Sequence, residues 1–493
     1  MKRYLALLLA VLMLAMTACG TAGGKSEEST SAATTTATAD STEGDVVETE
    51  PAEEDILASL GEKDFGGQAY VILDANDYPD MHINMPGKEL TGDTIKDAIW
   101  NRDALIEDKY HCDIQYIQMT NADVGITALR NSYHAGDKAY DICISTVSGG
   151  RLSTLATQGV LANLCDFEEL TLDANWWSKL IYESCRLGDR MFFTTGDIAP
   201  AMYEAPSCVI MNRKLLDENR IETDFYALVR EGKWTLEELH AVTKDADVDV
   251  NQDGKMHTEH DFFGLIYKSG ALCASEMMVG CGVSLCQING DTVTVDIISE
   301  KNEMIAEKWR EMTDGEIGFY DQHDMLNKTF KSDRAIAMIH FMEGPKNMLR
   351  NMESDYIVLP MPKYDVEQES YRSLVNGWCD CFVGMPNNVD MDFAGFVTEA
   401  LARESYHSVR PETYDLVYKL KSVREEGSSE MIDTIFNTLY IDFCQIYNFG
   451  EIPGALNSII FGGTPFTSSL SARKKLAENM INKFATSWLT AGT

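Results

Sequence analysis

The chain has 493 residues, and its 78 acidic and 41 basic residues give a formal net charge of −37 at pH 7. This acidity excludes a nucleic-acid partner, because binding to phosphates requires clustered lysines and arginines. A folded part of roughly 430 residues is too long for one compact core, so we expect two lobes.

The N-terminus predicts export and a lipid anchor. Lys2 and Arg3 precede an apolar run over residues 5–15, which is shorter than a bilayer-spanning helix. Residues 1–18 therefore indicate a signal peptide, and Met16-Thr17-Ala18-Cys19 resembles a bacterial lipobox. That resemblance implies a diacylglyceryl group on Cys19, which would hold the protein on the extracellular face of the cell membrane by its lipid alone. The alternative is an ordinary signal peptide with a chance cysteine.

The segment after Cys19 is typical of a flexible tether. Between residues 20 and 64, twelve acidic residues accompany only two lysines, and Ser/Thr runs replace large apolar residues before Ile56. Such a composition buries too little apolar surface to offset the entropy of ordering. We therefore predict a disordered acidic tether over residues 19–64 and a folded part that starts near Phe65.

The folded part begins with alternating strand and helix patterns. Strands are predicted at 69–73, 113–118 and 140–145, separated by helices at 93–111 and 122–135, and a later strand at 335–339. Strands connected in this way pair in parallel and place ligands at their carboxyl ends. The loops 76–81 and 145–150, and the loop after His340, are therefore expected at a binding crevice.

Eleven cysteines remain besides Cys19, and none forms a C-x-x-C pair. Several lie inside apolar, strand-like runs, where cysteine behaves as a small hydrophobic residue. We expect mostly buried free thiols. A disulfide within this set is possible, but the spacing does not place it.

Five stretches resemble, in chain order, the extracellular solute-binding lipoproteins of ABC importers, in the carbohydrate-type, family 1-like group. They are GDTIKDAIWNR at 92–102, YDI at 140–142 with QGVLANL at 158–164, NRKLL at 212–216 with EGKWTLEEL at 231–239, LPMPKYD at 359–365, and LARESYHSVRP at 401–411.

The resemblance implies an α/β fold of the periplasmic-binding-protein type II class, in which a hinge joins two α/β lobes around an interlobe cleft. Lobe 1 is expected over 65–197 and 377–426, and lobe 2 over 198–376 and 427–493, with a third crossing near 425–429. The implied function is capture of a carbohydrate, which we expect to be an oligosaccharide, by hinge closure, and its delivery to an ABC permease. We expect a monomer that is not an enzyme and requires no cofactor.

Ligand contacts are predicted from the crossings and the strand ends. Trp378 and Asp380 lie two residues apart at the expected return crossing, so strand alternation would place both side chains on one face. The alternative is that Trp378 is a core residue and Asp380 caps a turn. Asp197, at the first crossing, either contacts the ligand or satisfies hinge amides. The loops at the strand ends add three further candidates, Asn76, Tyr78 and Glu343.

A calcium loop is predicted at residues 249–261. The run Asp249-Val250-Asn251-Gln252-Asp253-Gly254-Lys255 matches the opening of an EF-hand loop, in which alternate oxygens surround the ion. Lys255 would supply its backbone oxygen, and Asp261 would replace the usual glutamate, because His260 occupies that position. The alternative is an acidic turn without an ion. A zinc site on His257 and His260 with Glu259 is disfavoured, because no third ligand is evident and the H-E-x-x-H motif is absent.

Two other functions remain open at this stage. A sensor subunit that presents its ligand to a membrane receptor would use the same clamp. A lipid-anchored glycan hydrolase or lyase would need a pair of carboxylates about 5 to 9 Å apart, which distant acidic residues could supply. The sequence contains no G-x-S-x-G motif and no H-E-x-x-H motif.

Overall fold

The computed structural model describes residues 56–79, 82–290, 292–313, 323–421 and 427–490. Its first sheet has the strand order β11-β3-β1-β2, formed by Cys381–Gly384, Ile142–Thr146, Gln68–Ala75 and Cys112–Gln118. β1 pairs in parallel with β2 and β3, as predicted, whereas β11 is antiparallel to β3. Ala75 pairs with Ser145, so the loops after β1 and β3 leave the sheet at the same edge.

The helices of this lobe begin and end close to the positions that the sequence predicts. α2 (Thr94–Tyr110) starts at Asp93, whose carboxylate accepts hydrogen bonds from the backbone N–H groups of Ile95 and Lys96. α3 covers Ala122–Ala135 and ends at Gly136, which adopts a left-handed conformation. The same lobe contains α4 (Arg151–Thr157), α5 (Lys179–Ser184) and α12 (Met391–Glu404).

The second sheet has the order β5-β8-β4-β9, formed by Phe263–Ile266, Ala335–Phe341, Ser207–Asn212 and Tyr356–Pro360. The predicted strand at 335–339 is thus confirmed as β8. Only the β5–β8 pair is parallel, because β4 runs antiparallel to both β8 and β9. The surrounding helices are α6 (Arg213–Glu218), α7 (Phe225–Arg230), α8 (Leu236–Thr243), α9 (Ala271–Gly280), α10 (Glu300–Thr313), α11 (His323–Lys331) and α13 (Ser428–Asn437).

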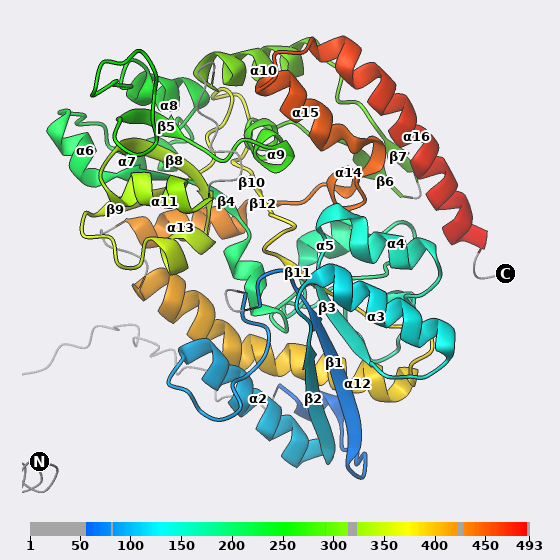
Figure 1. Cartoon of the computed structure of the whole chain (residues 1–493). Helices are drawn as coiled ribbons and strands as arrows, with labels where there is room; N and C mark the ends of the chain where they lie inside the picture. Colours follow the sequence, from blue (N-terminus) through cyan, green and yellow to red (C-terminus); the bar gives the residue numbers. More distant parts are fainter. Residues whose placement is uncertain (1–55, 80–81, 291, 314–322, 422–426, 491–493) are drawn as a thin grey trace, which may run out of the picture. The chain divides into compact units, whose positions relative to one another are not determined.

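Short strands connect the two sheets. β10 (Ser373–Leu374) pairs in parallel with β12 (Leu439–Tyr440), and a bridge joins Pro206 to Val375. A separate link continues from α12 through η6 (Ser405–Val409) and η7 (Pro411–Lys421) towards α13, which packs on β9 (Figure 1). The predicted third crossing at 425–429 falls partly on residues 422–426, which lie outside the described residues.

The described part of the chain after β12 contains three α-helices. They are α14 (Phe443–Ile446), α15 (Ile452–Ile460) and α16 (Phe466–Thr490). α15 packs against α9 and α10, and α16 packs against α15 (Figure 1). None of the helices among the described residues combines the length and apolar character needed to cross a membrane.

The predicted tether boundary at residue 64 is too late. Leu57 is buried in the main hydrophobic core, and the Tyr110 hydroxyl donates a hydrogen bond to its carbonyl oxygen. The 3-10 helix η1 (Ala58–Leu60) follows, and Arg403 of α12 binds the Ser59 hydroxyl. Ile56, Leu57 and Leu60 supply the apolar contacts that the acidic composition obscured. The signal peptide (1–18), Cys19 and the tether up to residue 55 lie outside the described residues.

Candidate functional site

A pocket of about 250 Å³ lies where segments from the two lobes meet. The loop after β3 and the segment around Trp378 form one wall, whereas α9 and the α14–α15 region form the other. Its polar lining consists of Ser148, Ser275, Gln445 and Asn448. Among the described residues that line this pocket, none carries a charged side chain.

Trp378 lines the pocket and is held there by a turn. Asn376 shapes this turn, because its Oδ1 accepts a hydrogen bond from the Trp378 N–H at 2.9 Å and its carbonyl oxygen accepts one from Cys379 N–H. The Ser148 N–H donates to the Gly377 carbonyl at 3.0 Å, which ties the turn to the loop after β3. The Trp378 side chain remains 42% exposed. It is therefore not a core residue.

Arg151 orients the indole ring from the first residue of α4. Its guanidinium carbon lies 5.3 Å from the Trp378 ring centroid. The same side chain donates to Asp77 at 2.5 Å and to Asp123 at 2.8 Å. Arg151 thus connects the loop after β1 to the turn that carries Trp378. Gly149 and Gly150 both have positive φ angles, which let the chain turn sharply between β3 and α4.

Gln445 contributes an amide side chain to the wall opposite Trp378. It belongs to α14, and its side-chain oxygen is buried without a hydrogen-bond partner among the described residues. Buried polar groups are normally hydrogen-bonded, so an unpaired oxygen at a pocket wall indicates a place for a donor from a ligand.

No family model and no curated protein matches this sequence. Solved structures do match its fold. The galacto-N-biose/lacto-N-biose I-binding protein of an ABC transporter from Bifidobacterium longum matches with 12% identity and a TM-score of 0.56, covering 86% of this chain and 99% of that chain. The maltose-binding protein MalE from Listeria monocytogenes matches with 14% identity, a TM-score of 0.55 and coverages of 84% and 98%. The GacH receptor of Streptomyces glaucescens matches with 13% identity and a TM-score of 0.54, covering 85% of this chain and 98% of that chain.

The chain has the fold of the solute-binding proteins of ABC transporters. This confirms the predicted type II periplasmic-binding-protein fold, with two α/β lobes, a hinge and an interlobe cleft. The pocket at Trp378 lies in this cleft, because its two walls come from segments that belong to different lobes.

Asp380 lies inside the hinge. Strand alternation predicted that it shares a face with Trp378, and this prediction is wrong because residues 376–380 form a turn. Only 2% of Asp380 is exposed, and the Thr195 hydroxyl donates to its carboxyl group at 3.4 Å. Burial raises the pKa of this carboxyl well above its ordinary value. Asp380 is therefore outside the pocket lining.

Asp197 is also buried, and the Tyr203 hydroxyl donates a hydrogen bond to its carboxyl group. Burial raises the pKa of Asp197 to about 6. Its own backbone N–H bonds to the carbonyl oxygen of Trp176 at 3.1 Å. Asp197 is outside the pocket lining, and the donor to its carboxyl group is the Tyr203 hydroxyl, whereas the alternative named backbone amides of the hinge.

Two candidate residues on the loop after β1, Asn76 and Tyr78, have different surroundings. Asn76 is fully buried, donates to Asp74 at 3.1 Å and accepts from the Tyr78 N–H at 2.8 Å, so it shapes the loop. Tyr78 is 50% exposed, and its ring centroid lies 5.7 Å from that of His82. Because the neighbouring Asp77 binds Arg151, Tyr78 lies on the loop that Arg151 ties to the Trp378 turn.

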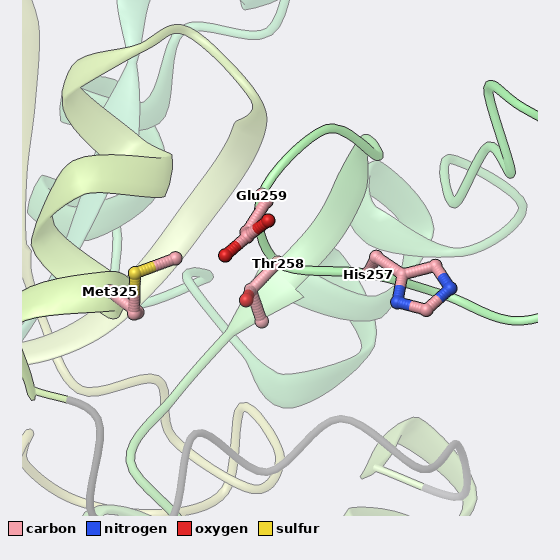
Figure 2. A pocket seen from close by; sticks show the side chains of 4 residues that line it. All are labelled: His257, Thr258, Glu259 and Met325. Atoms are coloured by element: carbon pink, nitrogen blue, oxygen red, sulfur yellow. The ribbon is translucent and has the colours of Figure 1, made fainter.

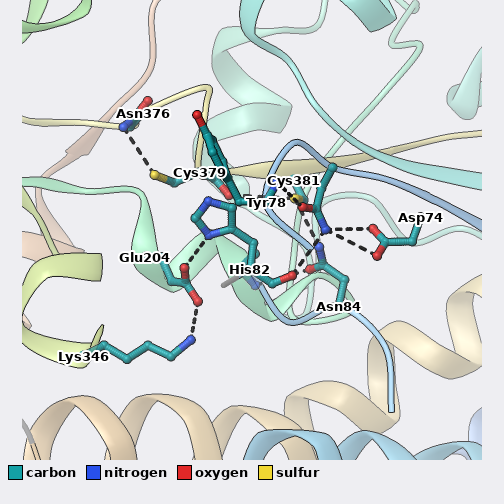
Figure 3. Close-up of polar contacts among 11 residues, drawn as sticks. Asp74, Tyr78, His82, Asn84, Glu204, Lys346, Asn376, Cys379 and Cys381 are labelled. Carbon is teal, nitrogen blue, oxygen red and sulfur yellow. Dashed lines mark hydrogen bonds and ion pairs between the residues drawn. The ribbon is translucent and has the colours of Figure 1, made fainter. Parts of the chain in front are cut away.

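Glu343 belongs to a buried ionic cluster with Glu204, His82 and Lys346. The Glu204 carboxylate bonds to His82 Nδ1 at 2.6 Å through one oxygen and to the Lys346 ammonium through the other (Figure 3). Burial, followed by the neighbouring charge of Glu204, raises the pKa of Glu343 to about 7. The cluster joins the loop after β1 to η4 (Pro200–Glu204) and η5 (Gly344–Met348).

The predicted calcium loop folds into a tight turn around its own carboxylates. Asp249 accepts hydrogen bonds from the N–H groups of Gln252 and Gly254 at 2.7 and 2.8 Å. Asp253 accepts from the Lys255 N–H, and the buried Asp261 closes the loop by accepting from the Val250 N–H at 2.9 Å. Gly254 has a φ angle of 80°, as the sharp turn requires. Asn251 donates to Asp253 at 3.0 Å.

A second pocket, of about 470 Å³, lies beside this loop and is lined by His257, Thr258, Glu259 and Met325. Figure 2 shows that the His257 ring and the Glu259 carboxylate point in different directions, which disfavours a joint zinc site. Among the described residues, Cys286, Asp442 and Cys444 form a group whose potential metal-ligand atoms all lie within 4.8 Å of one another. No residue of the predicted calcium loop belongs to that group.

Sequence reasoning missed Arg151, Ser275, Gln445 and Asn448. Arg151 follows the predicted loop at 145–150 directly, so extending strand-end logic by one residue would have found it. Gln445 and Asn448 lie on and just after a helix of four residues, which is too short to give a periodic pattern.

Proposed function

We propose that this protein captures a carbohydrate in its interlobe cleft and delivers it to the membrane subunits of an ABC importer. The observation that carries the proposal is the half-exposed Trp378 on a pocket whose polar lining is uncharged. An indole offers a flat apolar face to the C–H face of a sugar ring, and uncharged amides and hydroxyls bond to its hydroxyls. The lacto-N-biose I-binding protein and MalE, which bind sugars, support this proposal by their shared fold.

The ligand would stabilise the closed arrangement because it contacts both walls at once. Ser148 and Trp378 lie on one wall, and Gln445 lies on the other, so all three contact the same molecule only when the lobes are closed. A ligand shifts an equilibrium by its differential affinity for the two states, and these bridging contacts supply that difference. The permease would then select the closed form.

We propose an oligosaccharide that places one ring in this pocket. Pockets for drug-sized ligands have volumes of about 300–1,000 Å³, so a cavity of about 250 Å³ suits a part of such a molecule. The exposed Tyr78, on the loop after β1, offers a second aromatic surface for a following ring.

The protein would bind its ligand without chemical turnover. Glycoside hydrolysis requires two carboxyl groups that flank the bond to be cleaved. None of the described residues that line the pocket is acidic, and Asp380 and Glu343 are buried away from it.

The experiment is a thermal-shift screen with a panel of mono- and oligosaccharides, followed by Trp378→Ala on the best ligand. We expect a saturable rise in the melting temperature of the wild type, and its loss in Trp378→Ala with little change in the ligand-free melt. The control is Trp234→Ala, since Trp234 is fully buried in the core. That variant should lower the ligand-free melting temperature instead. Sugar consumption, or an equal loss of stability in both variants, would contradict the proposal.

We further propose that the mature chain is a lipoprotein on the extracellular face of the membrane, with its lipid on Cys19. The signal-like segment at 1–18 and the lipobox-like residues 16–19 support this. Metabolic labelling with a fatty acid, compared between the wild type and Cys19→Ala, tests it. A labelled Cys19→Ala variant would contradict it.

We also propose that the loop at 249–261 binds calcium through Asp249, Asn251, Asp253, the Lys255 carbonyl and Asp261. The turn at Gly254 and the closing contact of Asp261 support this. A chelator should lower the melting temperature, and added calcium should restore it; magnesium serves as the control. The effect should disappear in Asp249→Asn combined with Asp253→Asn, and an unchanged wild-type melt would contradict the site.

A further inference from the structure

Two cysteines that are 158 positions apart in the sequence meet behind the wall of the pocket. Cys286 follows α9, and Cys444 lies in α14. Both are buried free thiols, and their sulfurs lie within 4.8 Å of each other and of an Asp442 carboxylate oxygen. The Cys444 N–H also donates to the Cys286 sulfur at 3.2 Å. The two side chains therefore face each other inside the protein.

The hydrogen bonds of Asp442 argue against a metal ion at this place. Its Oδ2 accepts from the N–H groups of Leu285 and Cys286 and from the Tyr440 hydroxyl, at 2.8, 3.3 and 3.3 Å. Its Oδ1 accepts from the Cys444 N–H at 2.9 Å and from the Cys286 thiol at 3.5 Å. These five hydrogen bonds exceed the roughly four lone-pair sites of a carboxylate, so the Asp442 oxygens have no lone pair left for a metal ion. Moreover, three ligand side chains are one short of the closed four-coordinate set of a structural zinc site.

We propose that Cys286 and Cys444 form a disulfide bond when the chain folds in an oxidising compartment. One thiolate attacks an external disulfide, forms a mixed disulfide and releases one external thiol. The second cysteine thiolate attacks the mixed disulfide, which forms the Cys286–Cys444 bond and releases the second external thiol. The two electrons and two protons of the cysteines are thus transferred to the external disulfide. The proposed export supplies the oxidising compartment.

Because both sulfurs are buried in the folded protein, we expect the disulfide bond to form during folding. Cys286 is 5% exposed, and Cys444 is fully buried. The hydrogen bond with Cys444, together with burial, raises the pKa of the Cys286 thiol. Because the thiolate is the reactive form, the folded protein should react slowly, and the bond should form while this region is still open.

The bond would fix the wall of the pocket. α14 carries Gln445 and Ile446 into the pocket lining, and α9, which precedes Cys286, carries Leu272 and Ser275. A disulfide bond between the segment after α9 and α14 would hold these two parts of the wall in a fixed relative position. It would also stabilise the fold by restricting the unfolded chain, more strongly because the closed loop is long.

The test refolds the mature chain from denaturant with a mixture of oxidised and reduced glutathione. Free thiols are then alkylated, and the digested protein is analysed by mass spectrometry. We expect one linked peptide pair containing Cys286 and Cys444, and two fewer alkylated cysteines than in the fully reduced sample. Reduction should lower the melting temperature by roughly 5 °C.

Three variants complete the design. Cys286→Ala and Cys444→Ala should each remove the linked peptide and the dependence of the melting temperature on reductant. Cys208→Ala changes a buried cysteine of β4 outside this group, and it should retain both. Complete alkylation of the wild type after oxidative refolding would overturn the proposal, as would a different linked pair. Stoichiometric zinc that protects both thiols until it is chelated would also overturn it. The assay uses an added oxidant and no sugar, so its failure is distinguishable from failure of the proposed export or sugar binding.

Discussion

The pocket wall and the ionic cluster differ in how they satisfy their polar groups, although both lie where segments of the two lobes meet. In the cluster, both oxygens of Glu204 have partners, His82 on one side and Lys346 on the other. At the pocket, Gln445 keeps a buried side-chain oxygen without a partner among the described residues. In the cluster, charged side chains satisfy both oxygens of the buried Glu204 carboxylate, whereas the pocket wall carries an uncharged amide, which we propose is available to a ligand.

The largest expected effect tests the structural half of this comparison. Lys346→Met should reduce the free energy of unfolding by about 3–5 kcal/mol, because it leaves the Glu204 carboxylate buried without its strongest partner. Denaturant titration measures this loss. The matched control is Arg230→Met, whose partner Glu430 is half exposed, and it should leave the free energy of unfolding nearly unchanged. Similar losses in the two variants would show that burial does not set the strength of the cluster.

A pH effect of intermediate size should come from Glu343. Its pKa is raised from an ordinary 4.5 to about 7, so the folded state holds this proton more tightly than the unfolded chain. The corresponding stability is complete below about pH 4.5 and is lost as the pH rises through about 7, in total on the order of 3 kcal/mol. Glu343→Gln should remove this part of the slope.

The measurement is the free energy of unfolding at several pH values between 4 and 8, compared between the wild type, Glu343→Gln and Glu367→Gln. Glu367 is exposed, so its variant should follow the wild-type curve. A wild-type slope that persists in Glu343→Gln would assign the pH dependence to other buried carboxyl groups. Asp197 is one such group, because its pKa is also raised.

The regular elements could be predicted because their signals are local. The helix predicted at 122–135 has these bounds in the structure, since its apolar spacing and the terminal Gly136 are neighbours in the sequence. The edge of the first sheet followed from parallel pairing, which places the ends of β1 and β3 together. The fold was predicted through a resemblance that also rests on short local motifs.

The site could be predicted only in part because its contacts are not local. Trp378 was found, but the side chain of Asn376 converts the expected strand into a turn and removes Asp380 from the cleft. Glu204 lies 122 positions from His82 and 142 from Lys346, so sequence spacing does not predict their cluster. The acidic candidates were chosen by position in the chain, whereas burial decided which polar groups reach the pocket.

The smallest effect separates two partly buried glutamines, which have different hydrogen bonds. Gln368 donates to the Gly280 carbonyl and accepts from the Tyr364 N–H, at 2.9 and 3.0 Å, so Gln368→Leu should lower stability and leave sugar affinity unchanged. Gln445→Leu should do the reverse, because the described part of the chain supplies no hydrogen-bond partner to its amide oxygen. We expect a five- to tenfold weaker affinity, about 1 kcal/mol, with an unchanged or higher ligand-free melting temperature. Calorimetric titration and melting curves of both variants measure this. If Gln445→Leu destabilises the ligand-free protein as much as Gln368→Leu does, the Gln445 oxygen has a structural partner, and the contrast between pocket and cluster fails at this residue.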